Sequence, residues 1–356
     1  MTTARSRTIA LAVGGTAGHV YPAVAVAAEL HDAGFEVVFF GARRSIASKI
    51  VPHDGFEFVP IAGAPYERTG MAGKLTALTT LPFGFVQARA EIRRRGIAGV
   101  IGFGGYPTVA PLVAARSAGI WTAVHEANAQ FGRANALLAG HVDRIFAAVD
   151  GVHEAAVVVG VPVRRAIRRV AAEARRPPDG CATILVMSGT EPAPFLNAHV
   201  PSLLTGVRGP LRVIHQTAGS GDEDVRARYA AASIDADVAP YFEAIEDAYA
   251  RADLAITRAG ASTVAEVALC AIPAILVPNP TVAADHQTRN VRRFEEIGGT
   301  HWFAEARWDE RAVGATVEQL LHDEGSWCDA STRIRLLARG DAAERIASTV
   351  VAEVAR

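Results

Sequence analysis

Residues 254–266 read Leu-Ala-Ile-Thr-Arg-Ala-Gly-Ala-Ser-Thr-Val-Ala-Glu, an apolar run, then small residues, then a helical pattern from about Thr263. This order predicts a strand, a tight turn and a helix. Backbone N–H groups at a helix start have no partner inside the helix and carry partial positive charge, so the turn suits an anion. Glu266 falls in the first turn, where a carboxylate would repel a phosphate, so we assign it to a neutral diol such as a ribose. The alternative is ordinary helix capping by Ser262, Thr263 and Glu266.

A second polar cluster follows about twenty residues later. His286-Gln287-Thr288-Arg289-Asn290 comes after the apolar run 274–277 and opens another helical pattern. Ligands of parallel sheets bind at the carboxyl ends of the strands. Two polar clusters behind two strands therefore predict a nucleotide-sugar pocket.

The N-terminal part of the chain begins with the same strand, loop and helix order. The apolar run 8–13 ends in Gly14-Gly15-Thr16-Ala17-Gly18-His19, and a helical pattern follows from about Tyr21 to Ala33. The glycine spacing is not that of the dinucleotide motif G-x-G-x-x-G. His19 falls where the loop becomes a helix, and a histidine there can act as a general base near neutral pH. The alternative is a histidine that only caps or hydrogen-bonds the loop.

Apolar runs alternate with glycine or polar loops along the chain, which is typical of parallel sheets with crossover helices. A loop with His125, Glu126 and Asn128 falls at the same predicted sheet edge as His19. Segment 165–180 is charged and contains Pro-Pro-Asp-Gly, which predicts a linker. The predicted strands are 8–13, 36–40, 56–61, 99–103, 121–124, 144–149 and 156–159 in the first half, and 183–187, 211–215, 238–242, 254–256 and 274–277 in the second.

The sequence therefore predicts an α/β protein of two Rossmann-like, doubly wound domains facing across a cleft. We expect one domain at 1–164, a linker at 165–180, a second domain at 181–340, and a C-terminal helix at 341–356 that packs back on the first domain. A length of 356 residues, half of them apolar, fits two domains.

Composition and charge narrow the class of protein. The formal net charge of -1 argues against nucleic acid as a partner. The three cysteines have no metal-ligand spacing, and their odd number argues against a disulfide framework. Neither a signal peptide nor a spanning apolar run is recognisable, so we expect a cytoplasmic protein. The apolar stretch 75–86, broken at Pro82 and flanked by Lys74 and several arginines, leaves open peripheral contact with an anionic membrane. Its alternative is a helix packed on the sheet.

Several segments together resemble the MurG family. These are the peptidoglycan N-acetylglucosaminyltransferases that convert lipid I to lipid II, with the GT-B fold, in glycosyltransferase family 28. The segments occur in family order and span almost the whole chain. They are 14–19 with Pro22, 102–107, 125–128, 160–164, 215–217, 258–266 and 285–290.

The resemblance implies an inverting transfer from UDP-N-acetylglucosamine, which is a substrate, with no metal and no cofactor. His19 would be the catalytic base, and Glu266 would bind the ribose. The implied donor-binding residues are Arg164, Ser188, Phe242, Gly260, Ala261, Ser262, Thr263, Glu266, Gln287 and Asn290, where Phe242 meets the uracil through its backbone and Gln287 and Asn290 read the sugar. The implied acceptor-binding residues are Thr16, Ala17, Gly18, Tyr106, His125, Glu126 and Asn128.

Departures from the family pattern fall in the loops that would line the cleft. Ala17 stands where the family usually has glycine, in a loop near the acceptor diphosphate, and Val161 replaces an asparagine. Residues 188–194 read Ser-Gly-Thr-Glu-Pro-Ala-Pro in place of a glycine-rich, uncharged loop, so Glu191 adds a charge that would repel a diphosphate. The implied acceptor is a polyprenyl-diphosphate lipid. The departures leave open a soluble acceptor, such as a nucleoside or peptide antibiotic precursor, or an inactive UDP-sugar-binding protein.

Overall fold

The computed structural model describes residues 8–63, 70–189, 192–282, 285–297 and 301–354, with only the backbone of 70–79 and of 297. The chain divides into two compact units. Unit 1 comprises Met1–Arg164 together with Arg339–Arg356, and unit 2 comprises Arg165–Ala338.

Within the described residues, unit 1 is built on a seven-stranded parallel sheet in the order β3-β2-β1-β4-β5-β6-β7. The strand order reverses between β1 and β4, so the carboxyl ends of these two strands flank the crevice where parallel sheets bind ligands. The predicted strands are confirmed, with ends that differ by one or two residues. They are β1 (Thr8–Ala12), β2 (Glu36–Gly41), β3 (Glu57–Pro60), β4 (Ile97–Gly102), β5 (Trp121–Glu126), β6 (Arg144–Ala147) and β7 (Ala156–Val158).

Helices cover both faces of this sheet, which is why its strands are continuous apolar runs. One face packs on α1, α2 and α14, through residues that include Val20, Val51 and Ile346. The other packs on α3, α4 and α5, through Ile92 and Leu112 among others. The helices are α1 (Ala17–Asp32), α2 (Ala47–His53), α3 (Gly70–Arg95), α4 (Val109–Ser117), α5 (Arg133–Leu138) and α14 (Ala342–Val354), with 3-10 turns η1 (Tyr106–Thr108) and η2 (Ala139–His141).

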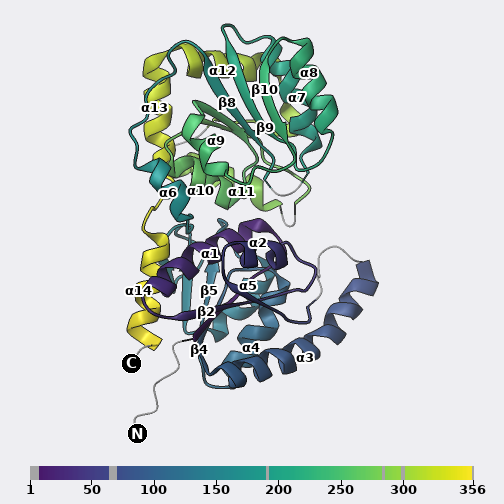
Figure 1. Cartoon of the computed structure of the whole chain (residues 1–356), viewed down its shortest axis with the longest axis vertical. Coiled ribbons are helices and arrows are strands. Elements are labelled where there is room, and N and C mark those ends of the chain that lie inside the picture. The colour runs from purple at the N-terminus through teal and green to yellow at the C-terminus, as the bar shows by residue number, and fades with distance from the viewer. Residues whose placement is uncertain (1–7, 64–69, 190–191, 283–284, 298–300, 355–356) are drawn as a thin grey trace. The chain divides into compact units, whose positions relative to one another are not determined.

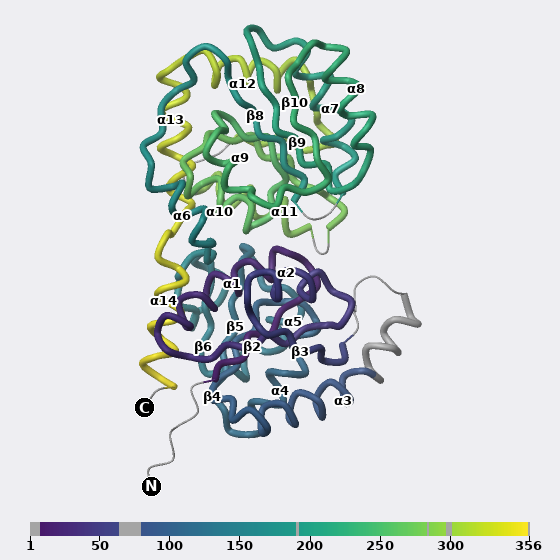
Figure 2. Tube along the Cα trace, viewed as in Figure 1, coloured from purple at the N-terminus to yellow at the C-terminus, as the bar shows by residue number. Residues whose placement is uncertain are grey.

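The C-terminal helix α14 belongs to unit 1 although it follows unit 2 in the chain. It lies beside α1, which begins more than 300 residues earlier (Figure 1; Figure 2). Glu353 accepts hydrogen bonds from Trp121 Nε1 and from Arg144. Arg345 donates to the carbonyl of Val158. The end of the chain therefore stabilises the sheet from β4 to β7.

Two helices of unit 1 differ from the sequence prediction. The first helix begins at Ala17 rather than near Tyr21, because Thr16 is extended and its carbonyl accepts the N–H groups of His19 and Val20. His19 therefore lies in the first helical turn. The apolar stretch that we predicted to break at Pro82 is one continuous helix, α3. Pro82 is exposed, so its ring lies on the solvent side of the helix.

Unit 2, over its described residues, has a six-stranded parallel sheet in the order β10-β9-β8-β11-β12-β13. α7, α8 and α12 cover one face through residues such as Val200, Tyr229 and Val317. Its strands are β8 (Ala182–Met187), β9 (Leu211–Gln216), β10 (Asp235–Ala239), β11 (Leu254–Thr257), β12 (Ala274–Leu276) and β13 (His301–Trp302). Its helices are α6 (Arg165–Ala171), α7 (Pro194–Thr205), α8 (Asp222–Ala231), α9 (Ile245–Arg251), α10 (Ala261–Leu269), α11 (His286–Ile297), α12 (Glu310–His322) and α13 (Glu324–Arg335), with the 3-10 turn η4 (Glu305–Arg307).

Three features of unit 2 correct the sequence prediction. The strand predicted at 238–242 is β10, which ends at Ala239, so Phe242 lies beyond the strand. β13 has only two residues and was not predicted. The segment predicted as a linker contains α6, whose Ile167 is buried, and Arg175, which donates to the carbonyls of Ala252 and Cys270. A charged segment is held to unit 2 because its arginine satisfies helix ends.

The end of α8 allows a stability prediction. Ser233 is exposed and has φ of 57°, and the N–H groups of Ser233 and Ile234 bond back to the carbonyls of Ala230 and Tyr229. Glycine has no Cβ penalty in this left-handed helix end, so Ser233→Gly should raise the free energy of unfolding of unit 2 by about 0.5–1 kcal/mol. Urea denaturation measures the change. Ser233→Ala is the matched control, and equal gain in both variants would contradict the explanation.

Candidate functional site

His19 lies in a cradle of glycines in unit 1. A Cβ atom at Gly14 would overlap His19 Nδ1, and a Cβ atom at Gly104 would lie 3.1 Å from His19 Nε2. Thr16 Oγ1 lies 3.1 Å from His19 Nδ1. The glycines bring the loops after β1 and β4 close to the ring, and Thr16 restricts its orientation. When Nδ1 carries the proton and donates to Thr16, Nε2 keeps the lone pair that a general base needs.

Glu126 stabilises the loop after β5 by accepting four hydrogen bonds from it and from the start of α5. Its Oε1 accepts from the N–H and the side chain of Asn128, each at 3.0 Å. Its Oε2 accepts from Gly132 N–H and from Asn135 Nδ2, both at 2.9 Å. Asn135 was missed by the sequence analysis. An amide among the alanines and leucines of 133–138 is the signal that could have identified it.

His125 is buried and links β5 to the segment after β7. Its Nε2 lies 2.9 Å from the carbonyl of Gly160, which can only accept, so Nε2 carries a proton. Burial lowers the pKa of His125 to about 4, although the bond to Gly160 acts in the opposite direction. The ring is therefore neutral near pH 7 and cannot supply a positive charge to a ligand.

The other residues of unit 1 that we predicted to bind a ligand include Arg164, Ala17, Gly18, Tyr106 and Asn128. The Arg164 guanidinium stacks on the Tyr21 ring of α1 at 3.9 Å, a contact that the sequence analysis missed. Ala17 is 3% exposed, so its methyl group packs inside the unit. Tyr106 opens η1 and is half-buried, as are Gly18 and Asn128.

In unit 2, residues 254–266 form β11, a turn and the start of α10, as predicted. The first backbone bond of α10 runs from Val264 N–H to the carbonyl of Gly260, so the N–H groups of Ala261, Ser262 and Thr263 point out of the helix end. Glu266 lies in the second turn of α10, rather than the first. It is 8% exposed, and Tyr249 donates a hydrogen bond to its Oε2 at 2.8 Å.

Gln287 and Asn290 hold the turn before α10. Gln287 Oε1 accepts from Ala259 N–H at 3.2 Å and from Asn279 N–H at 2.9 Å. Asn290 is fully buried, and its Nδ2 donates to the carbonyl of Ala259 at 3.2 Å. We predicted that both amides read the donor sugar. In this structure Asn290 Nδ2 and Gln287 Oε1 bond to backbone, and the contact of these amides with the sugar stays a prediction.

Arg258 and Glu305 form a buried ion pair beside this turn. Their nearest atoms are 2.6 Å apart, and Arg258 also donates to the carbonyl of Val277 at 3.1 Å. The pair ties the turn to the end of β12 and to η4. Glu305 could not be identified from sequence as the partner of Arg258, because the two residues lie 47 positions apart.

The carboxyl ends of β8 and β9 carry a second polar network. Ser188 donates to the carbonyl of Gln216 at 2.7 Å and is 5% exposed. His215 lies 3.1 Å from Asn197 Oδ1 and 2.9 Å from the Tyr229 hydroxyl, and burial lowers its pKa to about 3. Ser188 was predicted to bind the donor. Its hydroxyl is used to hold the neighbouring strand end, and Phe242 is half-buried beyond β10.

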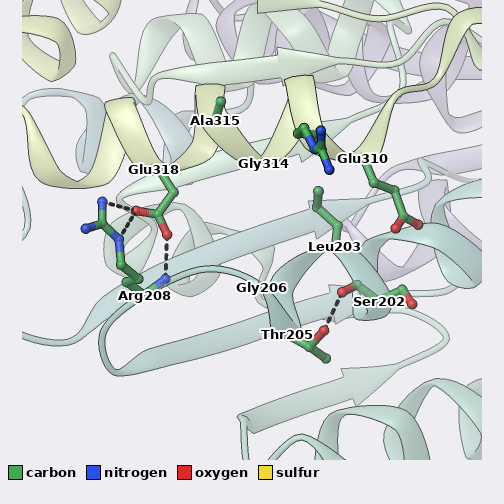
Figure 3. A pocket seen from close by; sticks show the side chains of 10 residues that line it. Ser202, Leu203, Thr205, Gly206, Arg208, Glu310, Gly314, Ala315 and Glu318 are labelled. Carbon is green, nitrogen blue, oxygen red and sulfur yellow. Dashed lines mark hydrogen bonds and ion pairs between the residues drawn. The ribbon is translucent and has the colours of Figure 1, made fainter.

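A cavity of about 610 Å³ lies elsewhere in unit 2, between α7 and α12. Figure 3 shows Arg208 and Glu318 paired at one end of it. It contains none of the predicted site residues, so we assign it no role in the proposed chemistry.

Other predictions concern residues that the structure does not describe, metal binding and membrane spans. Glu191, Lys74 and the side chains of 75–79 lie outside the described residues. In the part of the chain that the structure describes, no cluster of three or more His, Cys, Asp or Glu residues is arranged to hold a metal ion. No described helix is long and apolar enough to cross a membrane.

Comparisons with known proteins agree over both units. The family model described as "Glycosyltransferase family 28 N-terminal domain" matches residues 9–147, and "Glycosyltransferase family 28 C-terminal domain" matches 183–346. A Halorhodospira halophila protein is 36% identical over 98% of this chain and 99% of its own length, and a Paramagnetospirillum magneticum protein is 39% identical over 96% of each. Both are named UDP-N-acetylglucosamine--N-acetylmuramyl-(pentapeptide) pyrophosphoryl-undecaprenol N-acetylglucosamine transferase.

Solved structures show the same two-unit architecture. Acinetobacter baumannii MurG has a TM-score of 0.78 at 26% identity, with 97% of this chain and 99% of that one covered. The calicheamicin glycosyltransferase CalG4 has a TM-score of 0.69 at 16% identity, with 99% and 100% covered, which shows the fold alone. The predicted GT-B fold of two Rossmann-like units is confirmed.

The buried His125 makes unit 1 sensitive to acid. Its pKa is near 6.5 when unfolded and about 4 when folded, so the unfolded state takes up the proton first and stability is lost as pH falls from about 6.5 to 4. The expected loss is roughly 2 kcal/mol by pH 5. His125→Gln keeps a donor for Gly160 and should remove most of it.

Amide hydrogen exchange of β5 at pH 7 and pH 5, corrected for intrinsic rates, measures this loss. The exposed His53→Gln serves as the control. An equal acid sensitivity of β5 in the wild type and in His125→Gln would contradict the prediction.

Proposed function

The chain belongs to glycosyltransferase family 28, and we propose that it transfers N-acetylglucosamine from UDP-N-acetylglucosamine to the undecaprenyl-diphosphate lipid I, giving lipid II for peptidoglycan. The observation that carries this function is the 36–39% identity to enzymes of that name over 96–98% of the chain. The match spans both units, so it includes the proposed donor and acceptor sites.

Unit 2 supplies the features that a UDP-sugar requires. The outward N–H groups of Ala261 to Thr263 would bind the diphosphate, because they present partial positive charge without a bulky side chain. Glu266, a buried carboxylate in the second turn of the same helix, would accept hydrogen bonds from the ribose hydroxyls. The turn is held by Gln287 and Asn290, so it needs little reorganisation when the nucleotide binds.

Unit 1 supplies the base for an inverting, single displacement. His19 Nε2 would take the proton from the acceptor hydroxyl as that oxygen attacks the anomeric carbon and the bond to UDP breaks. Thr16 would hold the ring in the competent tautomer. Tyr106 and Asn128 would contact the acceptor, and Glu126 and His125 would shape the loop that presents Asn128.

We propose that charge on the departing UDP is neutralised by the α10 N–H groups and by Arg164, with no metal and no cofactor. Arginine forms strong charge-assisted bonds to phosphate oxygens, and its stack on Tyr21 restricts its orientation. Uracil would meet the backbone at Phe242, and Ser188 would lie near the diphosphate.

We also propose that the protein is cytoplasmic and contacts the inner face of the membrane, where an undecaprenyl-linked acceptor resides. Phe83 and Val86 on α3 are 69% and 64% exposed, and Arg89, Arg93 and Arg94 follow on the same helix (Figure 1). Exposed apolar side chains next to arginines suit an anionic lipid surface.

A transfer assay tests the activity. The wild-type protein should transfer N-acetylglucosamine from UDP-N-acetylglucosamine to a short-chain lipid I analogue. His19→Ala should lower kcat by about 10²–10⁴-fold, because general-base assistance is lost. Thr16→Val should lower kcat less, and its melting temperature should stay close to that of the wild type. Absence of transfer by a wild-type protein that is still stabilised by UDP would exclude lipid I and favour a soluble acceptor.

A vesicle assay tests the membrane contact. Phe83→Ser with Val86→Ser should weaken sedimentation with phosphatidylglycerol vesicles by at least about tenfold, since two apolar side chains no longer enter the lipid. The control is Leu336→Ser in unit 2, because Leu336 is also exposed, at 61%. Unchanged sedimentation of the double variant would rule out α3 as the contact.

A further inference from the structure

A buried tyrosine contacts the carboxylate that we assign to the ribose. Tyr249 on α9 is fully buried, and its hydroxyl donates to Glu266 Oε2 at 2.8 Å. The two residues lie 17 positions apart and come from different helices. The Oε2 of a carboxylate that is itself 8% exposed is thus held by a tyrosine hydroxyl.

The helices that carry this pair are fixed to each other. Arg175 donates to the carbonyls of Tyr249 and Ala252 at the end of α9, and to the carbonyl of Cys270 at the end of α10. The guanidinium therefore joins both helix ends. The backbone positions of Tyr249 and Glu266 do not depend on their own hydrogen bond.

Removal of the tyrosine hydroxyl should therefore change the orientation of the carboxylate more than the fold. Without the donor, the Glu266 side chain gains torsional freedom, and Oε2 must compete for other partners. A ligand hydroxyl would then have to order the carboxylate on binding, which weakens the contact.

We propose that Tyr249 is a positioning residue for nucleotide recognition. It holds Glu266 Oε2 so that Oε1 is presented to the hydroxyls of the nucleotide ribose. This inference rests on the proposed function, in which Glu266 binds the ribose of UDP. It makes Tyr249 a determinant of selectivity for nucleotides with an intact ribose diol.

The test compares UDP with 2′,3′-dideoxyuridine diphosphate, which lacks both hydroxyls, by calorimetric titration of the full chain. The wild type should prefer UDP by about ten- to a hundredfold, the range for hydrogen bonds to a charged group. Tyr249→Phe should weaken UDP binding by about five- to tenfold and dideoxy-UDP binding by less than about twofold.

Two controls separate positioning from folding. Tyr229→Phe removes another fully buried hydroxyl of unit 2, the one beside His215, and should leave the preference for UDP unchanged. In a Glu266→Ala background, Tyr249→Phe should change UDP affinity by less than about twofold, because the group it positions is absent. In turnover, Tyr249→Phe should raise KM for UDP-N-acetylglucosamine and leave kcat close to the wild-type value, because the ribose contact is the same in the ground and transition states.

The outcomes distinguish the inference from the function on which it rests. Equal binding of both nucleotides by the wild type would overturn the ribose assignment of Glu266, and the role of Tyr249 with it. A wild type that prefers UDP and a Tyr249→Phe variant with the same preference would overturn the role of Tyr249 alone. A loss of affinity that is equal for both nucleotides, or that persists without Glu266, would also overturn it.

Discussion

The proposed donor site depends on the backbone of Ala259 being held at both its N–H and its carbonyl. Gln287 accepts its N–H, and Asn290 donates to its carbonyl. Because the turn is held by side chains, the N–H groups at the start of α10 remain directed out of the helix for an anion. Arg258 and Glu305 tie the same turn to β12 and η4. If the turn binds the diphosphate as we propose, its backbone would need little reorganisation for binding and catalysis.

In unit 1, too, polar side chains that resemble ligand-binding groups hold the backbone and side chains of nearby loops in place. Glu126 binds the loop N–H groups and amides around it, and His125 bonds the carbonyl of Gly160. His19 differs because glycine backbone and Thr16 surround its ring, and we propose it as the base that acts on the acceptor. The groups proposed to touch substrate are thus few, and hydrogen-bonded buried polar residues hold the loops that carry them.

The sequence predicts the strands and the glycine turns well, because apolar runs of a doubly covered parallel sheet are unambiguous. It places the start of α1 several residues late, since Ala17 and Gly18 belong to a glycine-containing stretch that reads as a loop. In the structure, Thr16 precedes the helix and Ala17 begins it. It misses Tyr249, Glu305 and Asn135, whose partners come from other helices or loops and are set by tertiary packing. It does not reveal that Gln287 and Asn290 hold the backbone of Ala259, because a polar side chain at a helix start gives no sign in sequence of which backbone groups it contacts.

A crystal structure of the whole chain with UDP tests the central claim most directly. We expect the diphosphate on the N–H groups of Ala261 to Thr263, and the ribose hydroxyls on Glu266, with Tyr249 still bonded to the other carboxylate oxygen. UDP bound in unit 1, or in the cavity between α7 and α12, would contradict the account of unit 2 as the donor site.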